Sequence, residues 1–309
     1  MAKISYIQII RKCNQQCLFC SNPDNLRAMT LAKVKERIVE FKKQGTNEII
    51  FTGGEPTLHE DLLDIIKYAS DNNIKSRIIT NGQLLSRDYL SDLIKAGLKH
   101  LHLSFYSYKP QIQNYLSQND DSYKNIIIAL NNLKDTNISV NINTVINKKN
   151  AEHLDKNVIF LTTKYPFINH FVFNNLDPFM NRASENSFIV PRLVDFKKSL
   201  NNALKILKLN KKTFRVERVP LCYMLDHAQY STETRKIVKK ENRIISFLDD
   251  REILNQSHDQ FKWAELKECQ SCSLNKICAG LYAADKYYDP GELKPQTVDP
   301  QLIINKILN

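Results

Sequence analysis

The sequence lacks any apolar run near the ~20 residues that a membrane-spanning helix requires. The segment from Met1 to Ile10 contains a single lysine, and it has neither the apolar stretch nor the small-residue cleavage site of a secretory signal. We therefore expect a protein without a membrane span that works in the cytoplasm.

Glycine is scarce, with only 7 among 309 residues, whereas roughly 7% is usual in proteins. We therefore expect each glycine to lie where the backbone needs a conformation or a close approach that other residues do not permit. Gly53, Gly54 and Gly82 lie at the ends of predicted strands, which makes these positions candidates for tight turns or close approaches.

Acidic residues are outnumbered, with 33 Asp and Glu against 44 Lys and Arg, and the net charge of +11 favours acidic partners. The basic residues occur as scattered pairs such as Lys42-Lys43 and Lys239-Lys240, without interleaved aromatics. A solvated basic surface is the leading interpretation. The alternatives are nucleic acid, an acidic peptide and an acidic electron-donor protein.

The first 175 residues alternate short β-like runs with helical patterns. We predict strands over Ile4–Ile10, Glu48–Thr52, Lys75–Thr80, Lys99–Phe105, Ile138–Ile146 and Ile168–Phe173. The helical patterns are Leu31–Lys43, Leu62–Asp71, Arg87–Lys95, Tyr123–Lys134 and Asn150–Thr163. Strand-then-helix repeats imply an α/β fold with parallel strands, as a twisted sheet or a barrel, and a ligand site at the carboxyl ends of the strands.

This rhythm ends after Phe173. We expect a helix over Arg192–Leu209, strands over Thr213–Val219 and Arg243–Leu248, and a final helix over Pro300–Leu308. A domain boundary near residue 185 is predicted, which divides the chain into residues 1–185 and 186–309.

Seven cysteines, an odd number in a chain without an export signal, favour metal or thiol chemistry over disulfides. Cys13, Cys17 and Cys20 follow the first predicted strand, so one loop presents three thiols. Zinc suits this spacing, but structural zinc sites normally have four protein ligands, and no further Cys or His lies nearby. Three thiolates on an iron–sulfur cubane would leave one iron free to hold a substrate.

A second motif, Thr52-Gly53-Gly54-Glu55-Pro56, ends the next apolar strand. Two glycines allow the backbone to approach a ligand closely, and a carboxylate beside them can accept hydrogen bonds from an ammonium group.

Together these motifs resemble the radical S-adenosylmethionine (radical SAM) superfamily, whose Cys-x3-Cys-x2-Cys signature has an aromatic residue, here Phe19, before the last cysteine. The resemblance covers about residues 3 to 175 and implies a partial (β/α)6 TIM-like barrel. It also implies a four-iron four-sulfur cluster on Cys13, Cys17 and Cys20, whose open iron S-adenosylmethionine would chelate. One electron would then release a 5′-deoxyadenosyl radical, which takes a hydrogen atom from the substrate.

The same resemblance suggests which residues contact S-adenosylmethionine. Thr80-Asn81-Gly82 is similar to a Thr-Asn-Gly element of the family, and Ser104 and Asn143 occupy places where the family contacts the ribose or the carboxylate. The implied contacts are Phe19, Gly53, Gly54, Glu55, Pro56, Thr80, Asn81, Ser104 and Asn143.

Alternation along the fourth predicted strand places His100, His102 and Ser104 on one face and apolar residues on the other. We expect the polar face to line the barrel, with both histidines as hydrogen-bonded interior residues below the site. Tyr106 and Tyr108 follow at the barrel mouth as packing or substrate contacts.

The remaining cysteines are Cys222 and the run Cys269-x2-Cys272-x5-Cys278, which a glycine follows closely. This pattern resembles the SPASM or twitch extensions of radical SAM enzymes and implies one auxiliary four-iron four-sulfur cluster. A full SPASM domain has a further cysteine where this chain has Tyr282. Zinc is an alternative. Cys222 is favoured as the fourth ligand, but as a free thiol it could act catalytically by donating hydrogen to a substrate radical.

The leading hypothesis is a radical SAM enzyme that modifies a side chain of a ribosomal peptide or a protein. The second changes the substrate to a nucleotide, a sugar or another small molecule. The third is a non-catalytic, metal-stapled protein that binds nucleic acid through its basic surface. Both enzymatic hypotheses expect a reduced flavodoxin or ferredoxin as the electron donor.

Overall fold

A curved sheet forms the centre of the molecule in the computed structural model, which describes residues 4–22, 25–179, 181–248, 254–263, 266–284 and 286–309. Within these residues the strand order is β7-β6-β5-β4-β3-β2-β1-β8-β9. Neighbouring strands from β7 to β8 are parallel, and β9 pairs with β8 in the antiparallel sense. The strands are β1 (Ile4–Ile10), β2 (Glu48–Gly53), β3 (Lys75–Thr80), β4 (His100–Ser104), β5 (Ser139–Ile146), β6 (His170–Asn175), β7 (Thr213–Glu217), β8 (Arg243–Ser246) and β9 (Leu254–Gln256).

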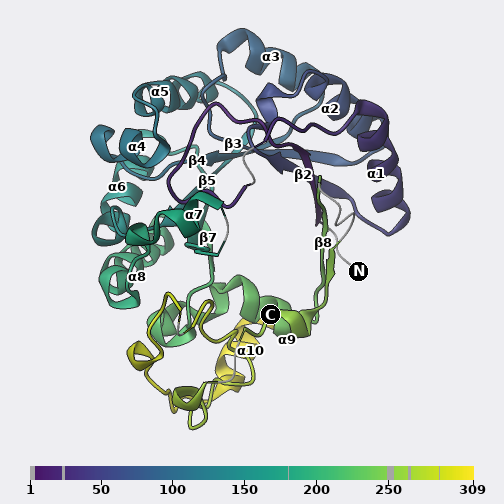
Figure 1. The fold of residues 1–309 in the computed structure, drawn as a ribbon. Helices are drawn as coiled ribbons and strands as arrows, with labels where there is room; N and C mark the ends of the chain where they lie inside the picture. Colours follow the sequence, from purple (N-terminus) through teal and green to yellow (C-terminus); the bar gives the residue numbers. More distant parts are fainter. Residues whose placement is uncertain (1–3, 23–24, 180, 249–253, 264–265, 285) are drawn as a thin grey trace.

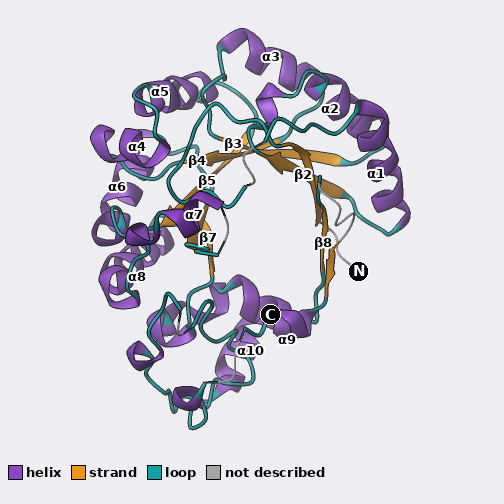
Figure 2. Cartoon of the chain, viewed as in Figure 1, coloured by secondary structure: helices purple, strands orange, loops and turns teal. Residues whose placement is uncertain are grey.

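Helices surround the outer face of the sheet, and the chain after β7 lies across the open side of the curve (Figure 1). Figure 2 shows the strands as an inner layer with helices outside. The helices are α1 (Leu31–Lys43), α2 (Leu62–Asp71), α3 (Arg87–Lys95), α4 (Pro110–Ser117), α5 (Ser122–Leu133), α6 (Leu154–Lys164), α7 (Asn181–Glu185), α8 (Leu193–Leu209), α9 (Thr232–Lys239) and α10 (Pro300–Leu308). This partial barrel confirms the predicted α/β class.

Local signals explain the element boundaries that the sequence predicted well. Thr30 caps α1 by accepting a hydrogen bond from the backbone N–H of Lys33, and Ser86 caps α3 in the same way. Helix α4 was not predicted, because it has only eight residues and follows β4 after a short connection. No helix in the described part of the chain is long and apolar enough to cross a membrane.

The two faces of the sheet differ in polarity, as the alternation along β4 predicted. Leu101 and Leu103 are fully buried beneath the outer helices, whereas His100 and His102 are only partly buried on the inner face. His102 Nε2 accepts hydrogen bonds from Arg77 Nη1 at 3.4 Å and from Asn141 Nδ2 at 3.3 Å. The histidine is thus a hydrogen-bonded interior residue of the barrel.

The sheet continues past residue 185, because β7 and β8 both come from the second half of the chain. β7 pairs with β6 at one end of the parallel set, and β8 pairs with β1 at the other. Between them, Ser231 forms an isolated bridge with Val216, and Glu233 Oε1 accepts a hydrogen bond from Arg218 N at 3.1 Å. A domain boundary near residue 185 stays a prediction.

Candidate functional site

The loop that follows β1 carries Cys13, Cys17 and Cys20 at the carboxyl edge of the sheet. The end of α4 holds this loop: Gln16 N donates to Ser117 O at 3.2 Å, and Leu18 N donates to Leu116 O at 3.0 Å. A helix that sequence reasoning missed therefore supports the cysteine loop.

A later segment also contacts the cysteine loop. Arg182 Nε donates to Cys17 O at 3.2 Å, and Asn186 Nδ2 donates to Leu18 O at 3.3 Å. The loop is thus fixed from two sides by residues far away in the sequence.

Gly53 and Gly54 bring the end of β2 against the start of the cysteine loop. Gly54 N donates to Ile10 O at 2.7 Å, and Glu55 N donates to Lys12 O at 2.9 Å. A Cβ atom on Gly54 would lie 2.2 Å from Arg11 O, and Gly53 has a φ of +135°. The close approach that these glycines permit is to the backbone of the loop. Their contact with S-adenosylmethionine stays a prediction.

The carboxylate of Glu55 joins three segments of the site. Oε1 accepts hydrogen bonds from Thr57 N at 3.1 Å, from the Thr57 hydroxyl at 2.6 Å and from the Thr80 hydroxyl at 2.6 Å. Oε2 accepts from Asn81 N at 2.7 Å. The residue is 1% exposed, and burial raises its pKa against these hydrogen bonds. Glu55 thus links the Gly-Gly-Glu-Pro motif to the end of β3, while Oε2 keeps capacity for another donor.

Asn81 connects the end of β3 to the first cysteine. Its Nδ2 lies 3.8 Å from Cys13 Sγ and 2.7 Å from Asn14 Oδ1. The structure therefore brings together the Cys-x3-Cys-x2-Cys, Gly-Gly-Glu-Pro and Thr-Asn-Gly motifs that the sequence analysis singled out separately.

Phe19 and Tyr106 cover Cys17. Their rings meet edge-on with centroids 4.7 Å apart. Tyr106 is buried, so of the two predicted roles the structure shows packing. Burial raises the pKa of Cys13 to about 11 and raises that of Cys17 as well. Thiolates here would need a cationic group, and the donor set of three thiols from one loop fits an iron–sulfur cluster with one open iron.

Ser104 and Asn143 lie side by side at the inner edge of the sheet, since they are register partners of β4 and β5. Asn174 of β6 extends this polar row, because its Nδ2 donates to Asn143 Oδ1 at 2.5 Å. Asn174 was missed by sequence reasoning, although the alternation along β6 places it on the inner face.

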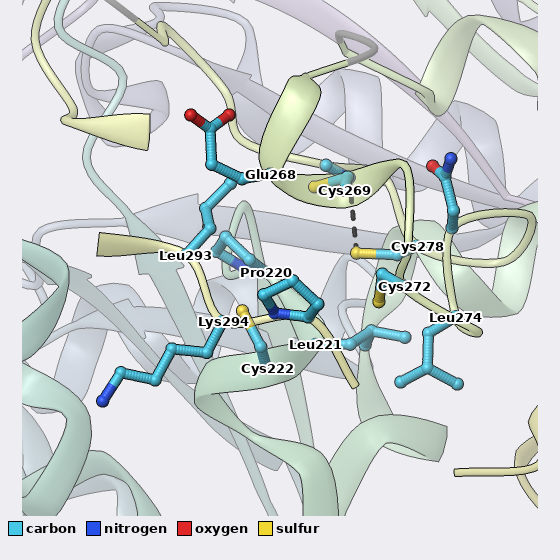
Figure 3. A pocket seen from close by; sticks show the side chains of 13 residues that line it. Pro220, Leu221, Cys222, Glu268, Cys269, Cys272, Leu274, Cys278, Leu293 and Lys294 are labelled. Atoms are coloured by element: carbon cyan, nitrogen blue, oxygen red, sulfur yellow. Dashed lines mark hydrogen bonds between the residues drawn. The ribbon is translucent and has the colours of Figure 1, made fainter. Parts of the chain in front are cut away.

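All four remaining cysteines line one small cavity, shown in Figure 3. Cys222 comes from a short turn after β7, and the other three come from the segment before Tyr282. The residues that sequence spacing grouped as the second cysteine set are therefore together in space.

Backbone N–H groups point at these thiols. Gly280 N lies 3.4 Å from Cys278 Sγ, and Gln296 N lies 3.4 Å from Cys272 Sγ. Such donors stabilise thiolates, and hydrogen bonds to sulfur tune iron–sulfur centres.

Among the described residues, no set of three or more Cys, His, Asp or Glu is arranged to hold a single metal ion.

Tyr282, which stands where a further cysteine would complete a SPASM pattern, connects the cysteine-rich segment to the barrel. Its hydroxyl donates to Asp177 Oδ2 at 3.1 Å, and the Arg218 guanidinium lies 5.4 Å from its ring centroid. The neighbouring Tyr288 hydroxyl donates to Asn175 Oδ1 at 3.1 Å. These tyrosines fix the segment to the loop after β6, a role that the sequence did not indicate.

The comparisons with known proteins agree with this geometry. The model of the radical SAM superfamily matches residues 7–161, half of the chain. The chain belongs to the radical SAM superfamily, a family of enzymes, which confirms the resemblance found in the sequence.

Curated relatives of the chain include proteins named PqqA peptide cyclase. That of Bradyrhizobium diazoefficiens is 28% identical over 152 residues, which cover 48% of this chain and 40% of the relative. That of Granulibacter bethesdensis is 31% identical over 153 residues, which cover 48% of this chain and 41% of the relative. The matches thus span less than half the length of these relatives.

Solved structures share the fold over most of the chain. Streptococcus suis SuiB bound to S-adenosylmethionine matches with a TM-score of 0.67 and 19% identity, over 94% of this chain and 77% of that chain. The protein anSMEcpe with bound AdoMet matches with a TM-score of 0.66 and 15% identity, over 99% of this chain and 95% of that chain. These likenesses confirm the partial barrel of the radical SAM superfamily.

Proposed function

We propose that this protein is a radical SAM enzyme that modifies a side chain in a ribosomal peptide or a protein. The observation that carries the proposal is the joining of three motifs at one place: the cysteine loop, the Gly53-Gly54 backbone and Asn81 meet around the carboxylate of Glu55. The choice of a peptide is supported by the relatives named PqqA peptide cyclase and by the shared fold of SuiB, which has been solved bound to the precursor peptide SuiA.

Cys13, Cys17 and Cys20 would hold a four-iron four-sulfur cluster, and Ser104, Asn143, Thr80 and the Gly53–Pro56 motif would contact S-adenosylmethionine. When bound, these groups supply one-electron cleavage of the sulfonium and removal of a hydrogen atom from the substrate.

The residues of the chain orient and protect this chemistry. Glu55 holds the ends of β2 and β3 in register, so that Asn81 faces Cys13. Phe19 and Tyr106 exclude water from the side of Cys17, which is 8% exposed. Ser104 and Asn143 offer hydrogen-bonding groups from neighbouring strands, where they can orient a ribose or a carboxylate.

The second cysteine cavity supports a further element of the proposal, a twitch-like auxiliary cluster on Cys222, Cys269, Cys272 and Cys278. Residues 1–185 would then carry the S-adenosylmethionine machinery, and residues 186–309 the auxiliary centre. None of the seven cysteines, all of which lie in the described part of the chain, forms a disulfide, which favours the reducing cytoplasm as the site of action. A reduced flavodoxin or ferredoxin would supply the electron.

Anaerobic reconstitution with iron and sulfide tests the proposal. We expect about eight iron atoms per chain and, after addition of dithionite and S-adenosylmethionine, 5′-deoxyadenosine detected by liquid chromatography. A variant in which Cys13, Cys17 and Cys20 are alanine should keep about half of the iron and form no 5′-deoxyadenosine. A fully loaded protein that leaves S-adenosylmethionine intact would contradict the proposal. If 5′-deoxyadenosine does form, mass spectrometry of short peptides encoded beside the gene, incubated with the enzyme, would identify the modified side chain.

A further inference from the structure

A polar groove runs along the first half of α8 and opens beside the second cysteine cavity. We call it the α8 groove, and its lining residues are Val194, Lys197, Lys198, Asn201, Asn202, Cys222, Tyr223, Leu225, Asp226, Lys294 and Gln296.

The α8 groove and the cysteine cavity share a wall. Cys222 and Lys294 line both spaces. Gln296, which also lines the groove, donates its backbone N–H to Cys272 Sγ at 3.4 Å. In Figure 3 the Lys294 side chain extends away from the thiols. A molecule seated in the groove is therefore separated from the cysteine cavity by a single layer of residues.

The groove carries excess positive charge. Lys197, Lys198 and Lys294 are exposed, and Asp226 is the one acidic residue among those that line it. Lys197 Nζ lies 5.2 Å from the ring centroid of Tyr223, which holds this ammonium group beside Cys222. Three cations against one anion favour an acidic partner.

The position of the groove decides which acidic partner fits. The apolar side of α8, including Phe196, Leu200 and Ala203, is buried against the barrel, and α8 lies in the outer ring of helices (Figure 1). The groove therefore opens to the outside of the barrel, whereas the first cysteine loop lies at the carboxyl edge of the sheet. None of the residues that line the groove belongs to the first cysteine loop, so the groove is not part of the site where a substrate atom would react. An electron donor, in contrast, needs only to come close to a metal centre.

We propose that the α8 groove is the docking site of an acidic electron-carrier protein. This inference rests on the proposed function, because it assumes a metal centre on the four thiols behind Cys222. One electron leaves the reduced iron–sulfur or flavin group of the carrier and enters that centre, and no atom or proton is transferred. Lys197, Lys198 and Lys294 attract the carrier and orient it over Cys222.

Binding measurements with a matched pair of variants test the proposal. The groove variant is K197E/K198E, and the control is K205E/K208E, which changes the same net charge at exposed positions of the same helix outside the groove. The probes are an oxidised plant-type ferredoxin and an oxidised flavodoxin, titrated anaerobically by calorimetry into the iron-loaded proteins at two salt concentrations. We expect the groove variant to bind one of them at least tenfold more weakly than wild type, and the control to stay within about twofold. The difference should shrink in high salt.

The docking site is wrong if both variants bind the probes equally weakly, or if neither variant loses affinity. It is also wrong if the wild-type protein binds neither probe. Dithionite separates this failure from a failure of the proposed function, because a small reductant does not need the groove. Wild type and both variants should form 5′-deoxyadenosine equally with dithionite. If none of them forms it, the proposed function is wrong.

Discussion

The guanidinium of Arg243, on β8, lies 3.6 Å from the carboxylate of Glu217, on β7, although six other strands separate β7 from β8 in the sheet. The ion pair thus joins the two ends of the parallel set. Arg243 also lies 5.7 Å from the ring centroid of Tyr6 and 5.5 Å from that of Phe261. The open side of the barrel is therefore closed by side chains rather than by strand pairing.

Removing the charge of Glu217 should destabilise the fold. In Glu217→Gln, Arg243 keeps its charge but loses its carboxylate partner, so we expect a loss of about 1–3 kcal/mol in the free energy of unfolding. The control is Asp71→Asn, which breaks the exposed pair between Lys67 and Asp71 and should cost less than about 0.5 kcal/mol. Urea denaturation of both variants measures the difference, and equal losses would show that the pair does not close the barrel.

The substitution Gly54→Ala should disturb the first cysteine loop selectively. Its Cβ would lie 2.2 Å from Arg11 O and 2.3 Å from Lys12 O, so the backbone that leads into the loop must move. We expect reconstituted protein to lose about half of its iron and to form no 5′-deoxyadenosine. Gly291→Ala is the control, because its Cβ would meet only the flexible side chain of Asp289, at 3.1 Å. Normal iron content in Gly54→Ala would contradict the role given to this contact.

Glu55→Gln should destabilise the place where the motifs meet, because it removes the charge and one of the two acceptor oxygens while keeping the size of the side chain. A glutamine amide has one acceptor oxygen, so either Asn81 N or the Thr57 and Thr80 donors would face an NH₂ group. We expect a loss of about 1–3 kcal/mol in stability, measured by thermal and urea unfolding without metal. The removal of this junction should also lower iron retention. A variant as stable as wild type would show that the carboxylate does not organise these segments.

Three histidines predict lower stability in acid. Burial is the main cause that lowers the pKa of His102 to about 3 and those of His153 and His170 to about 4. The unfolded chain therefore binds protons more readily, and stability is complete above about pH 6.5 and falls as the pH drops toward 4. Between the two pKa values, each histidine lowers the free energy of unfolding by about 1.4 kcal/mol for every unit by which the pH falls. Urea unfolding of the metal-free protein between pH 7.5 and 5 should show a shallower slope for His102→Gln than for wild type, and an unchanged slope would exclude His102.

Cys222 can be assigned by comparing two variants. If it is a cluster ligand, Cys222→Ala and Cys269→Ala should both weaken the second centre, and electron paramagnetic resonance of reduced protein should show the loss in each. If Cys222→Ala keeps an intact second cluster while Cys269→Ala loses it, then Cys222 is not a ligand. The free-thiol role would then be tested by the yield of modified substrate.

Much of the partial barrel could be predicted from sequence, because repeating apolar patterns record which side of each element is buried. Strand Lys75–Thr80 and helix Leu62–Asp71 have the predicted bounds. Helix α4 and strand β9 were missed, since both are too short for a clear period. The extra parallel strands β7 and β8 complete the sheet through pairings with β6 and β1, which no local pattern encodes.

The candidate site divides in the same way. Its motifs were visible because their residue types and spacings are local features of the chain. The donors from Thr80 and Asn81 to Glu55 and the row from Ser104 to Asn174 depend on which strands are neighbours in the sheet. The cover of Tyr106 over Cys17 depends on the packing of two loops that are far apart in the sequence. The attachment of Tyr282 to Asp177 joins residues more than a hundred positions apart, which spacing alone does not indicate.

The support of the cysteine loop by Arg182 and Asn186 bears on how the protein is made. Cys20 is synthesised roughly ten to thirty seconds before Asn186, at ordinary rates of translation. During that interval the chain does not yet contain Arg182 and Asn186, which support the loop that carries the three thiols. Iron and sulfide delivered to the nascent chain would therefore find flexible ligands, so the first centre is best assembled after synthesis has passed α7.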